Sequence, residues 1–125
     1  METKGKEITE KIKTFKDACL ELRIPIQEIS INQSVADIGS SVNAFYQLCI
    51  IIRALNEGWT PDWKDWSQRK WYNWFYVNST IVHAGLASSA AYSAIGARLC
   101  FKTKKLAEYA AVKFRSTYED YLLIK

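Results

Sequence analysis

The sequence is poor in the residues from which most active sites are built. It has a single histidine, His83, and three widely separated cysteines, Cys19, Cys49 and Cys100, with no CxxC pair. A closed zinc site needs four such ligands, and a catalytic triad needs a histidine between a nucleophile and an acid. GxGxxG, P-loop and HExxH motifs are absent as well. We therefore predict a protein with no metal, no cofactor and no enzymatic activity, in which His83 is structural or exposed.

The sequence also lacks the marks of a secreted or membrane-spanning chain. Residues 1–10 are charged and contain no apolar run, unlike a signal peptide. The longest apolar stretch, residues 48–52, is far shorter than the roughly 18–20 residues that cross a bilayer. An odd number of distant cysteines does not form a disulfide framework, so we expect three unpaired thiols that pack as small apolar side chains. These absences predict a cytoplasmic protein with no membrane partner.

Proline and glycine are sparse, with 2 and 5 copies, so the chain contains no collagen-like or linker region. The apolar fraction of 49% and the aromatic fraction of 14% exclude intrinsic disorder, because a disordered chain has little surface to bury. A length of 125 residues is common for a domain with one core. We predict a single domain over residues 1–125, in which residues 1–7 are a flexible tail.

Two helices are predicted in the N-terminal half. Thr14 and Asp17 have the spacing of a capping box, which predicts a helix over residues 15–22. Residues 6–13 extend this helix or form a separate strand. The four isoleucines of residues 24–31 predict an extended connector packed on the core.

The second helix is long and is expected from Ser34 to about Asn56. Gly58 suits the left-handed position that follows a helix, and Pro61 prevents continuation. Apolar residues at helical spacing predict its buried stripe: Ile38, Val42, Phe45, Cys49, Ile52 and Leu55.

The C-terminal half begins with an aromatic segment over residues 59–76, whose first part is a loop and whose residues 71–77 are a predicted strand. Strand alternation puts Trp71, Phe75 and Val77 on one face and Tyr72, Trp74 and Tyr76 on the other.

The remaining elements are less regular. The sequence is compatible with a second strand that starts at Thr80 and equally with a helix over residues 84–94. Residues 97–101 predict a short strand. Thr103 is expected to cap a last helix that runs to about Leu122. Together the elements predict an α+β fold: two N-terminal helices, a small antiparallel sheet and a C-terminal helix packed on it.

Several segments together resemble a known family. They are residues 12–18 (IKTFKDA), 54–63 (ALNEGWTPDW), 71–75 (WYNWF), 97–103 (ARLCFKT) and 106–110 (LAEYA) with Phe114. The chain resembles a family of small uncharacterised proteins encoded by bacteriophages and prophages of gut bacteria, over most of residues 8–122. The resemblance implies an accessory protein in the cytoplasm of a bacterial host, but it implies no active site.

Two positions depart from the family pattern. Asn73 stands where the family tends to have proline, and Lys105 stands where it tends to have glutamate. Lys105 places positive charge at a helix N-terminus, which is locally unfavourable.

Two weak catalytic patterns remain. Asp62 and Asp65 lie three residues apart, but paired acids in a loop are usually solvated. Cys100 has the cationic neighbours Arg98 and Lys102, which lower a thiol pKa, but a strand between core residues is a poor place for a nucleophile. We therefore expect a binding protein.

Charge is unevenly distributed along the chain. Residues 64–115 carry nine basic and two acidic side chains, a net charge of +7, whereas residues 1–63 sum to −2. Aromatic faces stack on bases and cations neutralise phosphates, so a basic aromatic surface favours single-stranded nucleic acid or a complex that processes it. The same residue types dominate protein interfaces, so an adaptor or inhibitor of a host protein is the alternative. A third reading is that the rings fill the core and the charges form an ordinary solvated face. The residues expected at this surface are Arg69, Lys70, Tyr72, Trp74, Tyr76, Arg98, Lys102, Lys104 and Lys105.

Overall fold

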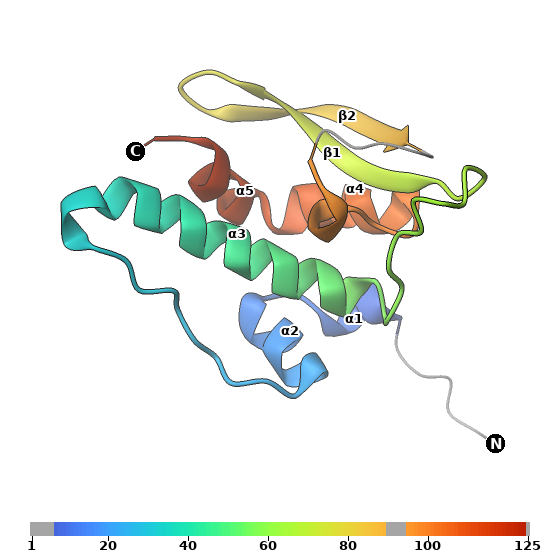
Figure 1. Ribbon diagram of the computed structural model, residues 1–125, viewed down its shortest axis with the longest axis horizontal. Coiled ribbons are helices and arrows are strands. Elements are labelled where there is room, and N and C mark those ends of the chain that lie inside the picture. The colour runs from blue at the N-terminus through green and yellow to red at the C-terminus, as the bar shows by residue number, and fades with distance from the viewer. Residues whose placement is uncertain (1–6, 90–94, 125) are drawn as a thin grey trace.

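The computed structural model in Figure 1 describes residues 7–89 and 95–124, so the predicted flexible tail lies almost entirely outside the described residues. In chain order the elements are α1 (Ile8–Lys11), α2 (Phe15–Leu22), a 3₁₀ turn η1 (Gln33–Val35), α3 (Ala36–Leu55), β1 (Lys70–Val77), β2 (Ile81–Ser89), a second 3₁₀ turn η2 (Ala97–Leu99), α4 (Lys104–Lys113) and α5 (Arg115–Leu122). The layers follow one another as α1 with α2, then α3, then α4 with α5, and finally the β1–β2 hairpin. The predicted α+β fold is confirmed, with a two-stranded antiparallel sheet.

The N-terminal capping box is confirmed. The Thr14 hydroxyl accepts from the Asp17 amide at 3.1 Å, and the Asp17 carboxylate accepts from the Thr14 amide at 3.1 Å. This carboxylate accepts from the Lys13 amide as well, and these hydrogen bonds lower the pKa of Asp17. Residues 8–11 form the short separate helix α1, which is neither of the two predicted alternatives.

The connector after α2 is only partly packed on the core. Arg23 ends α2 in the left-handed conformation, with φ 58°, and Ile24 then packs against the core. Ile26 and Ile29 are exposed, so the expectation that the whole connector is packed was wrong for them. Ile31 lies against Gly39 of α3, where any side chain at residue 39 would collide with it.

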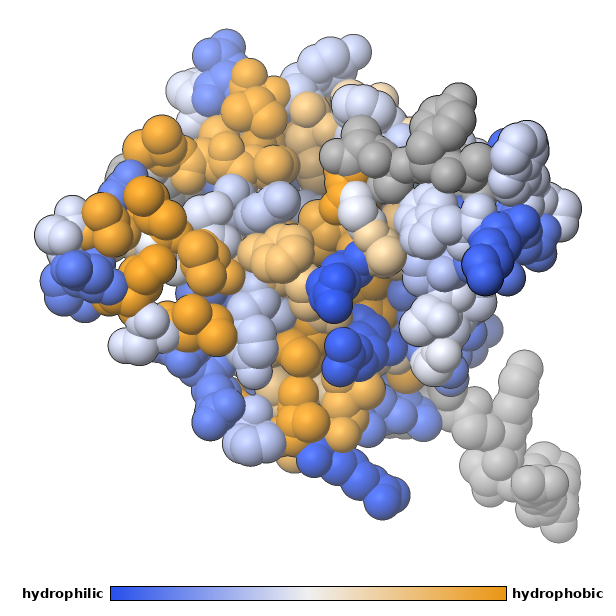
Figure 2. Space-filling model, viewed as in Figure 1, coloured by the Kyte–Doolittle hydropathy of each residue, from blue (hydrophilic) through white to orange (hydrophobic). Residues whose placement is uncertain are grey.

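Helix α3 starts two residues later than predicted. Asn32, rather than Ser34, supplies the capping oxygen, and it caps the 3₁₀ turn that precedes the helix. The predicted buried stripe is right at its C-terminal end and wrong at its start, where Ile38 and Val42 are exposed. α1, α2 and α5 cover α3 beyond its first turns, and apolar side chains gather on the surface near its start (Figure 2). Hydrophobic spacing identifies a helix face but not which end of it the neighbouring elements reach.

The stretch Gln33–Leu55 is long and apolar enough to cross a membrane, by length and composition only. The core helix of a soluble protein passes the same test, and α3 is the helix on which α1, α2 and α5 pack.

The hairpin resolves one of the open alternatives. Residues 81–89 form β2, so the strand alternative is correct and the helical alternative is wrong as far as residue 89; residues 90–94 lie outside the described residues. The register shifts between Trp74 and Phe75, where β2 contributes one extra residue as a bulge. The predicted strand over residues 97–101 is wrong: residues 97–99 form η2, and only Phe101 pairs with β1, at Trp71.

The predicted last helix is two helices. The helical backbone stops at Phe114, with φ −112° and ψ 29°, although neither proline nor glycine occurs nearby. The break lets α4 pack on β1 while α5 packs on α3. Phe114 itself is buried at the corner, which no local sequence signal indicates.

Helix α3 ends in two consecutive left-handed residues, Glu57 (φ 49°) and Gly58 (φ 88°). The predicted positive φ at Gly58 is confirmed, but Glu57 rather than Gly58 directly follows the cap residue Asn56. We expect Gly58→Val to lower the free energy of unfolding by about 1 kcal/mol or more, because a β-branched residue resists this conformation. Gly58→Asn is the matched control and should lose less, since asparagine tolerates a positive φ. Urea denaturation measures both, and equal stability of the Val and Asn variants would contradict the prediction.

Candidate nucleic-acid interface

The predicted basic aromatic surface is not assembled as expected, and Lys70 is the clearest correction. Its side chain has an exposed fraction of 0%. Its ammonium donates to the backbone carbonyl oxygens of Asp65 at 2.8 Å and Gln68 at 3.0 Å, and it lies 5.3 Å from the centre of the Trp63 ring. Lys70 therefore stabilises the loop between α3 and β1 and does not present its charge to a ligand.

The rings of β1 divide differently from the prediction. Trp74 and Tyr76 are 50% and 70% exposed, whereas Tyr72 is only 7% exposed and packs beside Trp74. On the other face, Phe75 stacks near Tyr118 of α5, with 4.8 Å between ring centroids, so Phe75 packs against the helical layer. Val77, which alternation places on the same face as Phe75, is exposed at the end of β1.

Of the other predicted lysines, Lys104 and Lys105 are exposed and Lys102 is half-buried, and each lies near a glutamate. Lys102 is 3.5 Å from Glu57, Lys104 is 4.0 Å from Glu108 and Lys105 is 3.4 Å from Glu7. Exposed ion pairs of this kind add little stability, roughly 0–1 kcal/mol each, but they reduce the positive field of the cluster.

Helix α4 packs on the face of the hairpin opposite Trp74. Asn73, whose side chain is buried, donates to the carbonyl oxygen of Ala107 in α4 at 3.0 Å. Strand alternation then directs Trp74 away from α4. The exposed rings of β1 and the lysines at the start of α4 therefore belong to opposite sides of the hairpin. Arg69, at the end of the loop before β1, is exposed.

A different part of the molecule brings cations and aromatic rings together. A cavity of about 370 Å³ lies between the C-terminal part of α3, the loop after it and η2. We call it the arginine–tryptophan pocket and define it by six of its lining residues: Cys49, Arg53, Trp59, Pro61, Trp63 and Arg98.

Two buried polar side chains hold the three walls of this pocket. Asn56, at the end of α3, donates to the Cys100 carbonyl oxygen at 2.9 Å and accepts from the Lys102 amide at 3.0 Å. This amide side chain ties α3, which carries Arg53, to the segment that follows Arg98. Lys70, at the start of β1, holds the loop that carries Trp63 through its hydrogen bond to the Asp65 carbonyl oxygen and its contact with the Trp63 ring.

The two arginines converge on one thiol. Burial raises the pKa of Cys49, while the positive charges of Arg98 and Arg53 both act to lower it. Both guanidinium groups are exposed, and neither forms an ion pair or a hydrogen bond with any other residue in the described part of the chain. The pocket therefore concentrates two positive charges that the described residues do not neutralise.

The thiol that lines the pocket is Cys49, which the sequence analysis did not single out. Cys100 does not lie in a strand; it is buried, and its thiol donates to the Gly96 carbonyl oxygen at 3.4 Å. Cys49 has two cationic neighbours in space, because α3, which carries Arg53, packs against η2, which carries Arg98. Of the pocket residues, only Arg98 was predicted at a binding surface.

The loop acids are solvated, as expected. The Asp65 carboxylate accepts from the Ser67 hydroxyl and amide, and these hydrogen bonds lower the pKa of Asp65. Asp62 is exposed and accepts from the Lys64 amide. Neither carboxylate lines the pocket.

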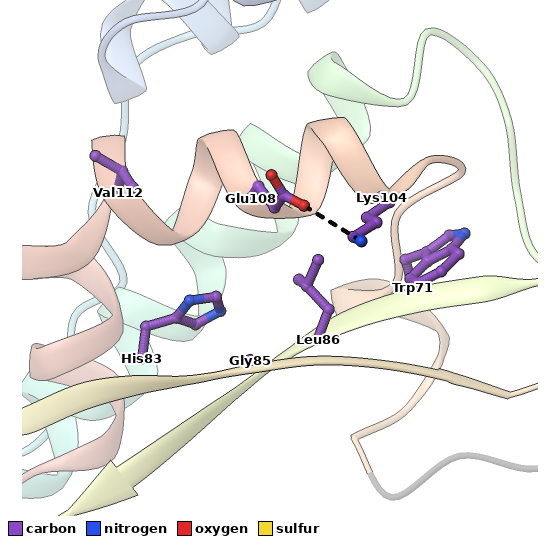
Figure 3. A pocket seen from close by; sticks show the side chains of 7 residues that line it. All are labelled: Trp71, His83, Gly85, Leu86, Lys104, Glu108 and Val112. Carbon is purple, nitrogen blue, oxygen red and sulfur yellow. Dashed lines mark ion pairs between the residues drawn. The ribbon is translucent and has the colours of Figure 1, made fainter.

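A second cavity, of about 510 Å³, lies between the hairpin and α4 (Figure 3). Trp71, His83 and Leu86 line it from the strands, and the Lys104–Glu108 ion pair lines it from α4. Because these two charges oppose each other, this groove has no net charge to attract an anion.

His83 in this groove is held by a hydrogen bond from Nε2 to the Asn73 side chain. The Asn73 amide must present its nitrogen to the Ala107 carbonyl, which can only accept, so its oxygen faces His83 Nε2 at 2.9 Å. Nε2 therefore carries a proton and donates it to this oxygen. His83 therefore has a structural role, which is one of the two alternatives predicted for it, structural or exposed. A proline at residue 73 would remove these contacts.

In the described residues, no group of three or more His, Cys, Asp and Glu side chains lies close enough to hold a metal ion. Comparison of the chain with protein-family models, with curated proteins and with solved structures finds no match.

The structural role of Lys70 is testable. We expect Lys70→Met to lower the free energy of unfolding by about 1–3 kcal/mol, because the carbonyl oxygens of Asp65 and Gln68 lose a charged donor. Lys64→Met in the same loop is the matched control, since Lys64 is exposed and should change stability by less than about 0.5 kcal/mol. Both values come from urea denaturation followed by tryptophan fluorescence. Equal stability of the two variants would mean that Lys70 does not hold the loop.

Proposed function

We propose that the protein binds single-stranded nucleic acid and that one nucleotide enters the arginine–tryptophan pocket. The observation that carries the proposal is the pair of guanidinium groups of Arg53 and Arg98, which lack acidic partners among the described residues and lie beside Trp59 and Trp63. Arginine binds phosphate oxygens through paired N–H donors. A base stacked on an aromatic face contributes about 1–3 kcal/mol.

The residues suited to binding phosphate and those suited to stacking on a base come from different walls of the pocket. The arginines come from α3 and η2, whereas Trp59, Pro61 and Trp63 come from the loop. A nucleotide has the same division, with a charged phosphate at one end and a planar base at the other. The net charge of +7 over residues 64–115 supports the approach of a polyanion to this half of the chain.

We further propose that this binding serves an accessory role in a bacteriophage or mobile element, within the cytoplasm of a bacterial host. The resemblance of residues 54–63, 71–75 and 97–103 to the phage and prophage family supports this part of the proposal. The first and last of these segments supply four of the six residues that define the pocket, so the resemblance and the pocket concern the same part of the chain.

Fluorescence anisotropy with a labelled single-stranded oligonucleotide tests the function. Arg53→Gln with Arg98→Gln should reduce the slope of log affinity against log salt by about 1.4, since each phosphate contact in a single strand contributes about 0.7. Trp59→Ala should instead weaken binding at every salt concentration, because stacking releases no counterions.

The matched control is Lys104→Gln with Lys105→Gln, which removes the same charge from exposed residues outside the pocket. This control should retain most of the salt slope. If the lysine control loses more of the salt slope than the arginine variant, the phosphate contacts lie at the start of α4 and not in the pocket. No binding by the unmodified protein in about 50 mM salt, where electrostatic contacts are strong, would remove the proposed function.

A protein partner is the second candidate, and the outer face of the hairpin favours it. Trp74, Tyr76 and Val82 are exposed there, with Tyr76 and Val82 paired across the strands. Exposed aromatic residues are common centres of protein interfaces. Trp74→Ala with Tyr76→Ala should leave oligonucleotide binding unchanged if the pocket is the nucleic-acid site. Pull-down from host lysate with and without nuclease separates a protein partner from a nucleic-acid one.

A further inference from the structure

The charge at the arginine–tryptophan pocket indicates which part of a nucleic acid it binds. Arg53 and Arg98 are permanently protonated at physiological pH, and both line the same cavity, so about two positive charges share one site. Arg53 lies in the last turn of α3, whose C-terminal dipole offsets about half of one charge. The pocket therefore presents a local charge of roughly +1.5.

The phosphates of a nucleic acid differ in charge. An internal phosphodiester carries one negative charge, whereas a terminal phosphate monoester carries about −1.5 to −2 at pH 7 and has three acceptor oxygens. Three oxygens allow two guanidinium groups to bind at once, each through paired N–H donors. The monoester matches both the charge and the number of donors better than the phosphodiester.

The size of the pocket agrees with a chain end. A volume of about 370 Å³ lies near the lower limit of small-molecule sites, which span about 300–1,000 Å³. It has room for one nucleotide-sized group rather than for several nucleotides of a continuous strand.

We infer that the pocket binds a terminal phosphate monoester, so that the protein recognises the phosphorylated end of a single strand. This inference rests on the proposed function and adds to it the chemical group that is recognised. The phosphate lies between Arg53 and Arg98, and the terminal base stacks on the tryptophans of the loop.

Cys49 provides a measurement that is independent of nucleic-acid labels. It lines the pocket and is partly exposed, whereas Cys19 and Cys100 are buried. A thiol reagent should therefore modify Cys49 first in the native protein. A ligand in the pocket should slow this modification, and a ligand bound elsewhere should not.

The experiment compares three oligonucleotides of one sequence, which carry a 5′-phosphate, a 3′-phosphate or only hydroxyl ends. We expect at least one phosphorylated form to bind about tenfold more tightly than the hydroxyl form and to protect Cys49 at correspondingly lower concentration. Thymidine monophosphate should protect Cys49, whereas thymidine should not. The preference should decrease as the pH falls through about 6, because the monoester then gains a proton and loses charge.

The variants separate this inference from the proposed function. Arg53→Lys keeps the charge but loses the paired donors, so it should reduce the preference for the phosphorylated end more than it reduces binding of the hydroxyl form. Equal affinity for all three oligonucleotides, with binding still weakened by Arg53→Gln and Arg98→Gln, would overturn the inference and leave the proposed function in place. Absence of oligonucleotide binding together with protection of Cys49 by thymidine monophosphate would overturn the proposed function and the recognition of a strand end, and would leave only a pocket for a free phosphate monoester.

Discussion

Residues 100–102 form the contact on which the rest of the structure depends. On one side, Phe101 exchanges two backbone hydrogen bonds with Trp71 of β1, at 3.0 and 2.7 Å. On the other side, the Cys100 carbonyl and the Lys102 amide bond to the Asn56 side chain at the end of α3. This three-residue segment thus joins the helical layer to the hairpin while Phe101 is completely buried between them. Because η2 precedes it and α4 follows it, its position sets both the pocket wall that carries Arg98 and the start of the helix that supports the sheet.

Burial of Lys70 shows why net charge along a sequence differs from charge at a surface. Its ammonium is satisfied by two carbonyl oxygens and by the Trp63 ring, which compensates for the loss of water around a buried cation. One of the nine basic residues between positions 64 and 115 is therefore part of the framework, and three others lie beside glutamates. Among the described residues, Arg53 and Arg98 have no acidic partner and line the same pocket, although they come from halves of the chain with opposite net charge.

Half of the candidate site could be recognised from the sequence. The aromatic segment after Gly58 is conspicuous, and Arg98 was expected at a binding surface. Arg53 and Cys49 could not be found this way, because they lie on an apolar helix whose spacing shows only that it packs. Their proximity to Arg98, 45 residues from Arg53 along the chain, follows from the packing of α3 against η2. The opposite error at Tyr72, which is buried while Trp74 and Tyr76 of the same face are exposed, has a similar cause: alternation assigns residues to faces, but the burial of each residue depends on what packs on it.

The sequence by itself determined the local structure of this protein. The capping oxygens of Thr14 and Thr103, the left-handed turn at Gly58 and the extended residues of β1 depend on interactions within a few residues, which local sequence specifies. Only the tertiary structure decided the break at Phe114, the burial of Lys70 and the meeting of Arg53 with Arg98. These features depend on contacts between residues far apart in the chain, such as Asn56 with Cys100 at a separation of 44 residues. Local preferences cannot encode such contacts, because their free energy exists only once the layers have packed.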